Sequence, residues 1–527
     1  MMWADLVLMG GNVLTMDPSQ PSAEAVAVKK DRIVRVGTNE DVNPWIGKTT
    51  KIVNLQGRTV VPGFIDCHIH VGDFGKFLMW IDLKDVDSIK EMKKRIRKRA
   101  QKIPQGRWII GKGWDQSRFS EKRYPNSQDL DEVSPDNPVI LYHQFGRVCI
   151  VNSKALEFAG VTKETKSPQG GRIEKDAETG EPTGIFREKA TDLVWKTIPE
   201  PTEDEFMEAI SLACNKIVEA GLTSIHWIVA SWTEISVIQK LSAENKLLLR
   251  VYVIAPANIL DKIEESQSLL DSSYNMDRNL GVKIFIDGSL AGRTAALHEP
   301  YSDDPSSRGH LLYSQEELDS LVLRVHKGNL RLVVHAMGDQ AIGMTLTAIE
   351  KALMEAPRKS LRYRLEHASV LNEELIQRIK RLGMIVSVQP KVVISEFSVW
   401  SAIDRLGPDR ARWLYPLKTL INESIEVVGG SDCPMEPLSP LLGIQAAVTR
   451  KFFPEEQISV DEGLRMYTVD AAYASFEEKL KGSIEEGKLA DFVILSGDPY
   501  EIEPSQFGDI KVDMTIVGGK IVYQRLT

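Results

Sequence analysis

The chain has 527 residues, of which 43% are hydrophobic and 26% are charged, with a formal net charge of -9 and a pI near 5.7. This composition supports a large buried core and predicts one big domain with satellites, or two to three domains. The acidic balance argues against a nucleic-acid partner, and no stretch reaches the about eighteen uninterrupted apolar residues of a membrane span, so we expect no membrane insertion.

The start of the chain and its cysteines both bear on location. The opening MMWADLVLMGGN has no basic region followed by a cleavable apolar segment, so we expect no secretory signal. Cys67, Cys149, Cys214 and Cys433 are widely spaced without a C-x-x-C pair, which suits a reducing cytoplasm and excludes a thiolate zinc ribbon. We therefore expect a cytoplasmic protein in which Cys67 and Cys433 are small buried hydrophobic residues.

The two ends of the chain carry similar strand patterns. Residues 6–14 are expected to form two strands around the turn Gly10-Gly11, and residues 515–523 two strands around Gly518-Gly519. Further strand candidates are residues 25–28, 32–37 and 490–495. This similarity predicts one small β-sandwich domain built from both termini, with two unrelated hairpins as the alternative.

Between the two ends, strand candidates alternate with segments of helical period, a pattern typical of a parallel sheet connected by helices. The eight strand candidates are residues 60–70, 222–228, 249–255, 281–287, 330–335, 363–367, 384–389 and 425–430. The clearest helix candidates are residues 203–220, 314–328, 340–355 and 372–382. Eight such units predict an α/β fold, a (β/α)8 TIM barrel whose active site lies at the carboxyl ends of the strands.

Residues 72–200 are too many for one strand-to-helix connection, so we expect an inserted subdomain that caps the barrel mouth. Its basic run at residues 90–99 predicts a surface helix, because apolar residues recur through it at helical spacing. The expected domains are residues 1–57 and 471–527 for the β-sandwich, 58–71 and 201–470 for the metal-binding barrel, and 72–200 for the insert.

Side chains of metal-binding type stand at the ends of several predicted strands. His68 and His70 lie two apart, so on a strand both project to the same side and can meet one cation. A single His-x-His is weak evidence, but others follow at strand ends. They are Lys283 and Asp287 on the fourth strand, His335 on the fifth, His367 on the sixth and Asp432 after the eighth. Chance is a poor account of this set, which predicts a metal centre.

Seven segments together carry a family resemblance. They are residues 62–70, 111–115, 151–156, 282–290, 335–339, 366–368 and 430–432. With these segments the chain resembles the amidohydrolase superfamily, and within it the amidohydrolase family 3 group that includes N-substituted formamide deformylase-like enzymes. The similarity covers nearly the whole length, and it implies a barrel flanked by a small β domain from both termini.

The resemblance also implies the cofactors. It places His68, His70 and Asp432 on one divalent ion, His335 and His367 on a second, and Lys283 between them as an Nζ-carbamate formed with carbon dioxide. A cationic lysine cannot bind a cation, whereas the carbamate is an anion able to span two ions. An ion-paired or snorkelling Lys283 is the alternative. Zinc is the first choice for both ions, and iron, manganese or cobalt would also fit.

The expected activity is that of a metal-dependent amidohydrolase acting on carbon-nitrogen bonds other than peptide bonds, in N-acyl or N-formyl amides. A metal-bridging hydroxide would attack the carbonyl, with Asp432 as the catalytic proton shuttle. Cyclic amides or esters are alternative substrates, and a deaminase or a non-catalytic binding protein are alternative functions. Gly338 disfavours a deaminase, because nucleobase aminohydrolases usually have a glutamate there. The expected partner is a small-molecule amide, and a homodimer is compatible with the sequence.

Five residues are candidates for substrate contact: Trp114, Asp115, Tyr124, Arg147 and His298. Packing of Trp114 within the insert is the alternative for that residue. Arg147 stands where relatives commonly have histidine, and Trp227 where they often have aspartate. A cation and an indole there would favour an anionic or bulkier acyl group. We expect His326, within a helix pattern, to lie on the surface.

Overall fold

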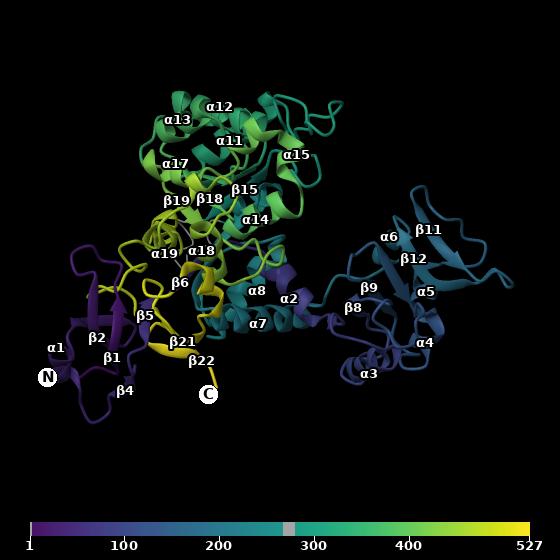
Figure 1. Cartoon of the computed structure of the whole chain (residues 1–527), viewed down its shortest axis with the longest axis horizontal. Helices are drawn as coiled ribbons and strands as arrows, with labels where there is room; N and C mark the ends of the chain where they lie inside the picture. Colours follow the sequence, from purple (N-terminus) through teal and green to yellow (C-terminus); the bar gives the residue numbers. More distant parts are fainter. Residues whose placement is uncertain (1–2, 267–279, 527) are drawn as a thin grey trace. The chain divides into compact units, whose positions relative to one another are not determined.

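The computed structural model describes residues 3–266 and 280–526 (Figure 1). The chain divides into two compact units, one made of Met1–Phe74 with Ser211–Thr527 and the other of Gly75–Ile210. Among the helices of the described residues, none is both long enough and apolar enough to cross a membrane.

The larger unit contains the predicted parallel barrel. Its strands follow one another around the sheet in chain order: β6 (Phe64–Ile69), β13 (Leu222–Ile228), β14 (Arg250–Pro256), β15 (Gly281–Phe285), β16 (Arg331–Ala336), β17 (Arg364–His367), β18 (Ile385–Val388) and β19 (Val427–Gly429). The segment after β19 returns to β6, where Asp432 N–H donates to His68 O at 2.7 Å and His70 N–H donates to Cys433 O at 3.0 Å. These bonds close the ring at the carboxyl ends of the strands, which confirms the expected fold class.

Helices connect the barrel strands. They are α7 (Glu203–Glu219), α8 (Trp232–Ala243), α9 (Leu260–Glu265), α11 (Gln315–Lys327), α12 (Asp339–Glu355), α13 (Glu373–Leu382), α14 (Pro390–Ser398), α15 (Ala402–Leu406), α16 (Pro408–Ala411), α17 (Leu417–Asn422), α18 (Pro440–Val448), α19 (Val460–Met466) and α20 (Val469–Ala474). Short 3-10 turns are η1 (Asn43–Trp45), η2 (Ala257–Ile259), η3 (Pro454–Glu456) and η4 (Pro504–Asp509), and a four-residue helix, α1 (Asn39–Val42), precedes η1.

Helix α13 illustrates how local sequence sets these elements. The Asn372 side chain accepts the N–H of Leu375 and caps the first turn, and Gly383 ends the helix in the left-handed conformation. Acidic residues lie in its first turn and basic residues in its last, which suits the helix dipole. Its buried side chains Leu375, Ile376 and Ile379 share one face at helical spacing.

Strands from both termini form one mixed sheet, as expected for a domain built from both ends. Its order is β22-β21-β20-β5-β1-β2-β3, with β4 beside β1. The strands are β1 (Leu6–Leu14), β2 (Ser22–Lys29), β3 (Arg32–Gly37), β4 (Lys51–Asn54), β5 (Thr59–Pro62), β20 (Phe492–Leu495), β21 (Val512–Val517) and β22 (Lys520–Gln524). Apolar side chains from both termini share one core, in which Leu8, Val26 and Val60 lie with Phe492 and Ile516.

The expected turn at Gly10-Gly11 is wrong. Residues 6–14 form the single strand β1, whose register against β2 shifts between Met9 and Val13, so the two glycines form an irregularity within the strand. Both halves of β1 pair with the same neighbour, β2, so the chain does not reverse there. The hairpin expected at Gly518-Gly519 is present between β21 and β22.

The smaller unit, an insert after β6, has its own sheet in the order β11-β12-β10-β9-β8-β7. The strands are β7 (Ile81–Asp82), β8 (Ile109–Trp114), β9 (Val139–His143), β10 (Val148–Val151), β11 (Gly171–Lys175) and β12 (Pro182–Glu188). The helices of this region are α2 (Val71–Met79), α3 (Ile89–Ala100), α4 (Ser127–Asp131), α5 (Ser153–Ala159) and α6 (Thr191–Trp195). Helix α3 carries the basic run and buries Ile89, Met92 and Ile96, so the surface helix is confirmed. The residue boundaries expected for the four domain segments stay predictions.

Candidate metal centre

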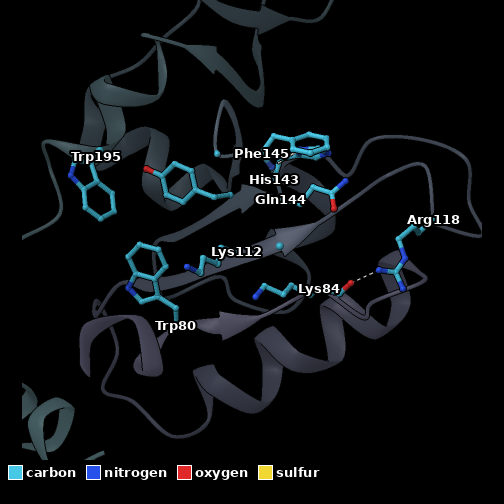
Figure 2. Close-up of a pocket in the computed structure, with 11 residues that line it drawn as sticks. Trp80, Lys84, Lys112, Arg118, His143, Gln144, Phe145 and Trp195 are labelled. Atoms are coloured by element: carbon cyan, nitrogen blue, oxygen red, sulfur yellow. Dashed lines mark hydrogen bonds between the residues drawn. The ribbon is translucent and has the colours of Figure 1, made fainter. Parts of the chain in front are cut away.

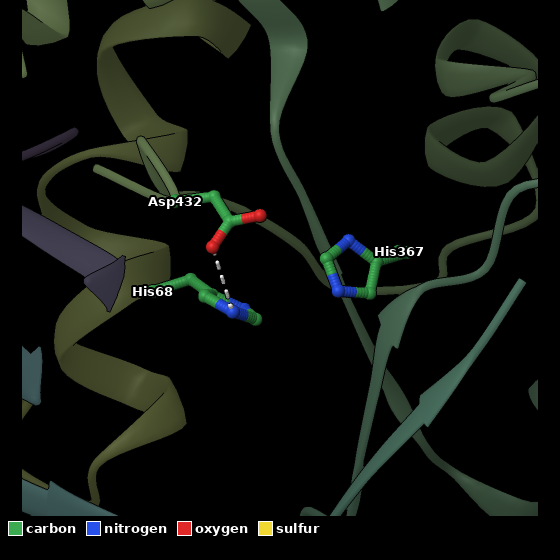
Figure 3. Close-up of side chains that lie close together, drawn as sticks. All are labelled: His68, His367 and Asp432. Carbon is green, nitrogen blue, oxygen red and sulfur yellow. Dashed lines mark ion pairs between the residues drawn. The ribbon is translucent and has the colours of Figure 1, made fainter. Parts of the chain in front are cut away.

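Six side chains singled out in the sequence gather at the carboxyl ends of the barrel strands. One oxygen of Asp432, Oδ1, lies 3.2 Å from His70 Nε2 and 3.5 Å from His68 Nε2. One nitrogen of His68, one nitrogen of His367 and a carboxylate oxygen of Asp432 all lie within 4.8 Å of one another. Figure 3 shows these three side chains facing a common space. The His335 ring continues the cluster, with its centroid 4.5 Å from that of His367.

Two of these residues adopt a backbone conformation that L-residues seldom occupy. His367 has a φ of 67° and Asp432 a φ of 54°, each just past the end of its strand's regular pairing. A side chain in the left-handed region costs roughly 1–2 kcal/mol. Strain of this kind concentrates at functional sites, where the surrounding structure holds a side chain in position.

Lys283 projects from β15 into the same cluster. The side chain is buried, and its Nζ has no hydrogen-bond partner among the residues that the structure describes. Burial lowers the pKa of this amine to about 8, despite the opposing charges of Glu366 and Asp432. A buried amine with a depressed pKa is far more often neutral than an exposed lysine, and only the neutral amine can combine with carbon dioxide.

The histidines of the cluster also favour the uncharged form. Burial lowers the pKa of His335 to about 4 and lowers the pKa of His68 and His367 well below the usual 6.5. Burial raises the pKa of Asp432, but the neighbouring His68 and His70 more than offset it, so the carboxylate is ionised at neutral pH. Neutral imidazoles with an ionised carboxylate are the protonation states that divalent metal binding requires, so these residues fit a metal centre.

A buried polar network lies beneath the cluster. Glu366 forms a short hydrogen bond with His68 Nδ1 and accepts Arg364 Nε–H at 2.9 Å. Arg364 in turn hydrogen-bonds His226 Nδ1 at 2.7 Å and donates to Cys67 O at 2.6 Å. Glu366 fixes the ring orientation of His68 and leaves Nε2 facing Asp432, the arrangement that orients histidine ligands in metal sites.

Sequence reasoning missed this supporting network, although a signal for it was present. Arg364 and Glu366 lie two apart on β17 and so share the face that points into the barrel. A pair of opposite charges within a buried strand is costly unless the two groups pair with each other, so Arg364-Leu365-Glu366 could have indicated an internal ion pair.

Asp287 has a different environment from the other strand-end residues. Its carboxylate accepts three backbone N–H groups, from Ala296 at 2.9 Å, Met337 at 3.0 Å and Gly338 at 2.8 Å. Three such bonds tie the loop after β15 to the loop after β16. Asp287 therefore stabilises the loops that flank His335.

Four of the five candidate substrate residues lie in the insert. Trp114 is buried and donates its indole N–H to Leu141 O at 2.9 Å, so it packs in the core of the insert. Tyr124 packs edge-on against Trp114, and Asp115 accepts a hydrogen bond from Gln144 at 2.7 Å. Arg147 is 77% exposed, with Glu188 at 3.8 Å. The structure thus gives Trp114 the packing role.

The remaining histidines and Trp227 complete the comparison with expectation. His298 is exposed on the loop after β15, where its N–H donates to Asp339 Oδ1 at 2.9 Å. The expectation for His326 is wrong: it is buried and hydrogen-bonds Tyr363 OH at 2.7 Å and Ala356 O at 2.6 Å, because α11 is covered on that face too. Trp227 points away from the barrel interior to Glu234, at 2.9 Å, so its indole does not shape the site.

The four cysteines are all free and buried, as expected. Burial raises the pKa of the Cys433 thiol to about 12, so it is not a thiolate at neutral pH. Neither Cys67 nor Cys433 is then suited to act as a metal ligand beside the histidines.

Comparison with known proteins gives consistent matches over nearly the whole chain. A family model described as the amidohydrolase family matches residues 51–523. The protein YtcJ of Bacillus subtilis is 36% identical over 98% of this chain and 99% of its own length. The N-substituted formamide deformylase of Arthrobacter pascens is 28% identical over 99% of this chain and 98% of its own.

A solved structure gives the same result at the level of the fold. The crystal structure of a metal-dependent hydrolase from Pyrococcus furiosus is similar with a TM-score of 0.77 and 31% sequence identity, covering 94% of this chain and 99% of that one. Together with the family model and the barrel centre described above, these similarities establish that the chain belongs to the amidohydrolase family, in its family 3 group.

Proposed function

We propose that this protein is a metal-dependent hydrolase that cleaves carbon-nitrogen bonds in small N-acyl or N-formyl amides. The observation that carries the proposal is the gathering of six potential ligands at one end of the barrel in a chain of this family. The relatives add support, because one is named a formamide deformylase and another a metal-dependent hydrolase.

The residues divide into two ligand groups with a bridge. His68, His70 and Asp432 would hold one divalent ion, His335 and His367 the other, and carboxylated Lys283 would lie between them. Zinc suits the mixed nitrogen and oxygen donors. When bound, the ions would activate water and polarise the substrate carbonyl.

Asp432 is the residue that moves the proton. Its carboxylate is ionised, and its Oδ1 lies between the Nε2 atoms of His68 and His70. It would accept a proton from the attacking water and pass it to the leaving nitrogen, because an amine leaves poorly unless it is protonated. Glu366 keeps His68 in the tautomer whose Nε2 faces this carboxylate.

A panel of N-formyl, N-acetyl and lactam compounds tests the proposal, with released amine as the readout and His335→Ala as the blank. We expect at least one open-chain amide to be hydrolysed by the natural protein and none by the variant. Hydrolysis of lactams or esters alone would replace the open-chain amide with a cyclic or ester substrate. Equal rates with the variant would contradict a metal-centred reaction.

The deaminase alternative has less support. At Gly338 a side-chain Cβ would lie 1.9 Å from the backbone oxygen of Ala296, so the glutamate of nucleobase deaminases has no room at this position. The next residue, Asp339, accepts the N–H of His298 and is already engaged. A test with adenine and cytosine that releases ammonia would restore the deaminase.

A non-catalytic binding protein is the other alternative. Such a protein would be expected to lose ligands, yet all six candidate residues are present. Elemental analysis after purification with added metal separates the two functions, because less than about one divalent ion per chain would favour the binding protein.

A further inference from the structure

The insert contains a second chemical environment that the barrel chemistry does not use. A cavity of about 810 Å³ opens on this unit and is lined by residues from the turn after β7, from β8, from β9 with its turn, and from the end of α6. This volume lies in the range of small-molecule pockets, about 300–1,000 Å³. Figure 2 shows Lys84 and Lys112 projecting into the same space, beside Trp80.

The cavity has an uncompensated positive charge. Lys84, Lys112 and Arg118 line it, and the lining contains no aspartate or glutamate within the described part of the chain. Arg118 is turned toward the backbone oxygen of Lys84. Asp82 favours the charged form of Lys112, but burial and the neighbouring Lys84 outweigh it and lower the pKa of Lys112.

Lys112 is the central group of this cavity. It is half-buried, and the contacts of its ammonium are with aromatic faces, 4.0 Å from the Phe77 centroid and 5.7 Å from that of Trp80. It forms no ion pair among the residues that the structure describes. A half-buried cation that lacks a carboxylate gains most from an anionic ligand, since charge-assisted bonds are about twice as strong as neutral ones.

Aromatic side chains form the other wall. The ring centroids of Trp80 and Tyr142 lie 6.4 Å apart at an interplanar angle of 19°, and Trp195 meets both rings edge-on at 6.0 and 5.9 Å. Lys112 and Tyr142 are register partners on β8 and β9, so both side chains emerge on one face of the sheet. Trp195 is 42% exposed, which leaves its ring open to a ligand.

The backbone is arranged to bring the second lysine to this wall. Gly113 has a φ of 104°, and a Cβ there would lie 2.7 Å from Lys84 Cγ and 3.0 Å from Lys84 N. Only glycine combines this conformation with so close an approach. Gly113 therefore permits Lys84 to lie beside Lys112.

We propose that this cavity of the insert is a binding site for a small aromatic carboxylate, whose ring packs on Trp80, Tyr142 and Trp195 and whose carboxylate pairs with Lys112 and Lys84. The site is independent of the proposed hydrolysis, because it uses none of the six candidate metal ligands. It also differs from the anion site suggested by Arg147 in the sequence, since that side chain is exposed beside Glu188.

Isothermal titration of the full-length, metal-loaded protein with three probes tests the proposal. Phenylacetate carries both a ring and a charge, phenylacetone carries the ring without the charge, and acetate carries the charge without the ring. We expect phenylacetate to bind at least about tenfold more tightly than either of the others, since each half of the ligand contributes separately. Equal binding of acetate or of phenylacetone would overturn the proposed aromatic carboxylate.

Variants locate the binding. Lys112→Met and Trp195→Leu should each weaken phenylacetate binding by about tenfold or more, and Lys84→Met by less, because Lys84 is more exposed. Lys166→Met is the matched control, an exposed lysine of the insert outside the cavity, and should bind normally.

Carboxylates can also bind metal ions, so the barrel requires its own control. Phenylacetate binding that persists in Lys112→Met but disappears in His335→Ala would place the probe at the barrel centre and contradict the insert site. Binding that persists in His335→Ala and weakens in Lys112→Met would support it, whether or not any amide is hydrolysed. Circular dichroism of each variant confirms that the fold is retained.

Discussion

The barrel interior and the cavity of the insert hold buried cations in different ways. Arg364 is fully buried and is matched by Glu366 at 2.8 Å, with further bonds to Cys67 O and Ser387. Lys112 is half-buried and is matched only by aromatic rings. A closed interior must satisfy each charge internally, whereas an open cavity can leave a charge for a ligand. Complete pairing therefore indicates support, and incomplete pairing near solvent indicates binding.

Asp432→Asn tests the barrel side of this comparison with the largest expected effect. The amide cannot accept the proton, so we expect the rate constant for hydrolysis to fall about 10²- to 10⁴-fold. Steady-state kinetics on the best amide of the panel measures it, with bound metal determined in the same sample. A loss of less than about tenfold with normal metal content would remove Asp432 from proton transfer.

A matched pair of substitutions tests the comparison itself. Arg364→Met leaves Glu366 as an unpaired buried charge, so we expect the free energy of unfolding to fall by about 3–5 kcal/mol. Lys112→Met removes a cation that has no carboxylate partner, so we expect a change within about 1 kcal/mol. Urea unfolding of both variants gives the values. Similar losses in the two would show that the distinction is false.

The pH dependence of stability follows from the buried histidines. The pKa of His335 is about 4 in the folded protein and about 6.5 when unfolded, so the unfolded chain binds more protons between these values. Stability from this residue is present above about pH 6.5 and is lost as the pH falls toward 4, by roughly 3 kcal/mol in total.

Urea unfolding of the metal-free protein at pH 7 and pH 5 measures this loss. His335→Gln should flatten the dependence, because glutamine does not titrate in this range. An unchanged slope in the variant would assign the effect to other groups.

Glu366→Gln should weaken metal binding without removing a ligand. Loss of the charged acceptor at His68 Nδ1 is expected to lower metal affinity about 10- to 100-fold. Competition with a chromophoric chelator measures it. Glu456→Gln is the control, a buried glutamate that accepts hydrogen bonds from Thr419 and lies outside the cluster. Equal affinities in the two variants would mean that Glu366 supports the fold alone.

Most of the barrel could be predicted from the sequence, because its strands are short apolar runs that end in polar residues. The expected strand at residues 222–228 has the observed bounds of β13, and those of β16 differ by one residue at each end. The ligand candidates His335 and His367 were identifiable because parallel strands bring their carboxyl ends to one rim.

Other features depended on contacts that the sequence pattern does not contain. Gly10-Gly11 has the composition of a turn, but pairing of both flanks with β2 makes it an irregular part of one strand. His326 looked exposed because helical period alone does not show that its ring reaches Tyr363. The cavity around Lys112 required the register of β8 and β9 and the position of α6, which come from distant segments.

The central claim is that six side chains of the barrel bind two divalent ions. Elemental analysis of the natural protein, purified with added zinc and dialysed, tests it most directly when it is paired with the double variant His335→Ala/His367→Ala. We predict about two ions per chain in the natural protein and about one in the variant, which keeps His68, His70 and Asp432. Fewer than about one ion in the natural protein, or the same content in both, would contradict the account.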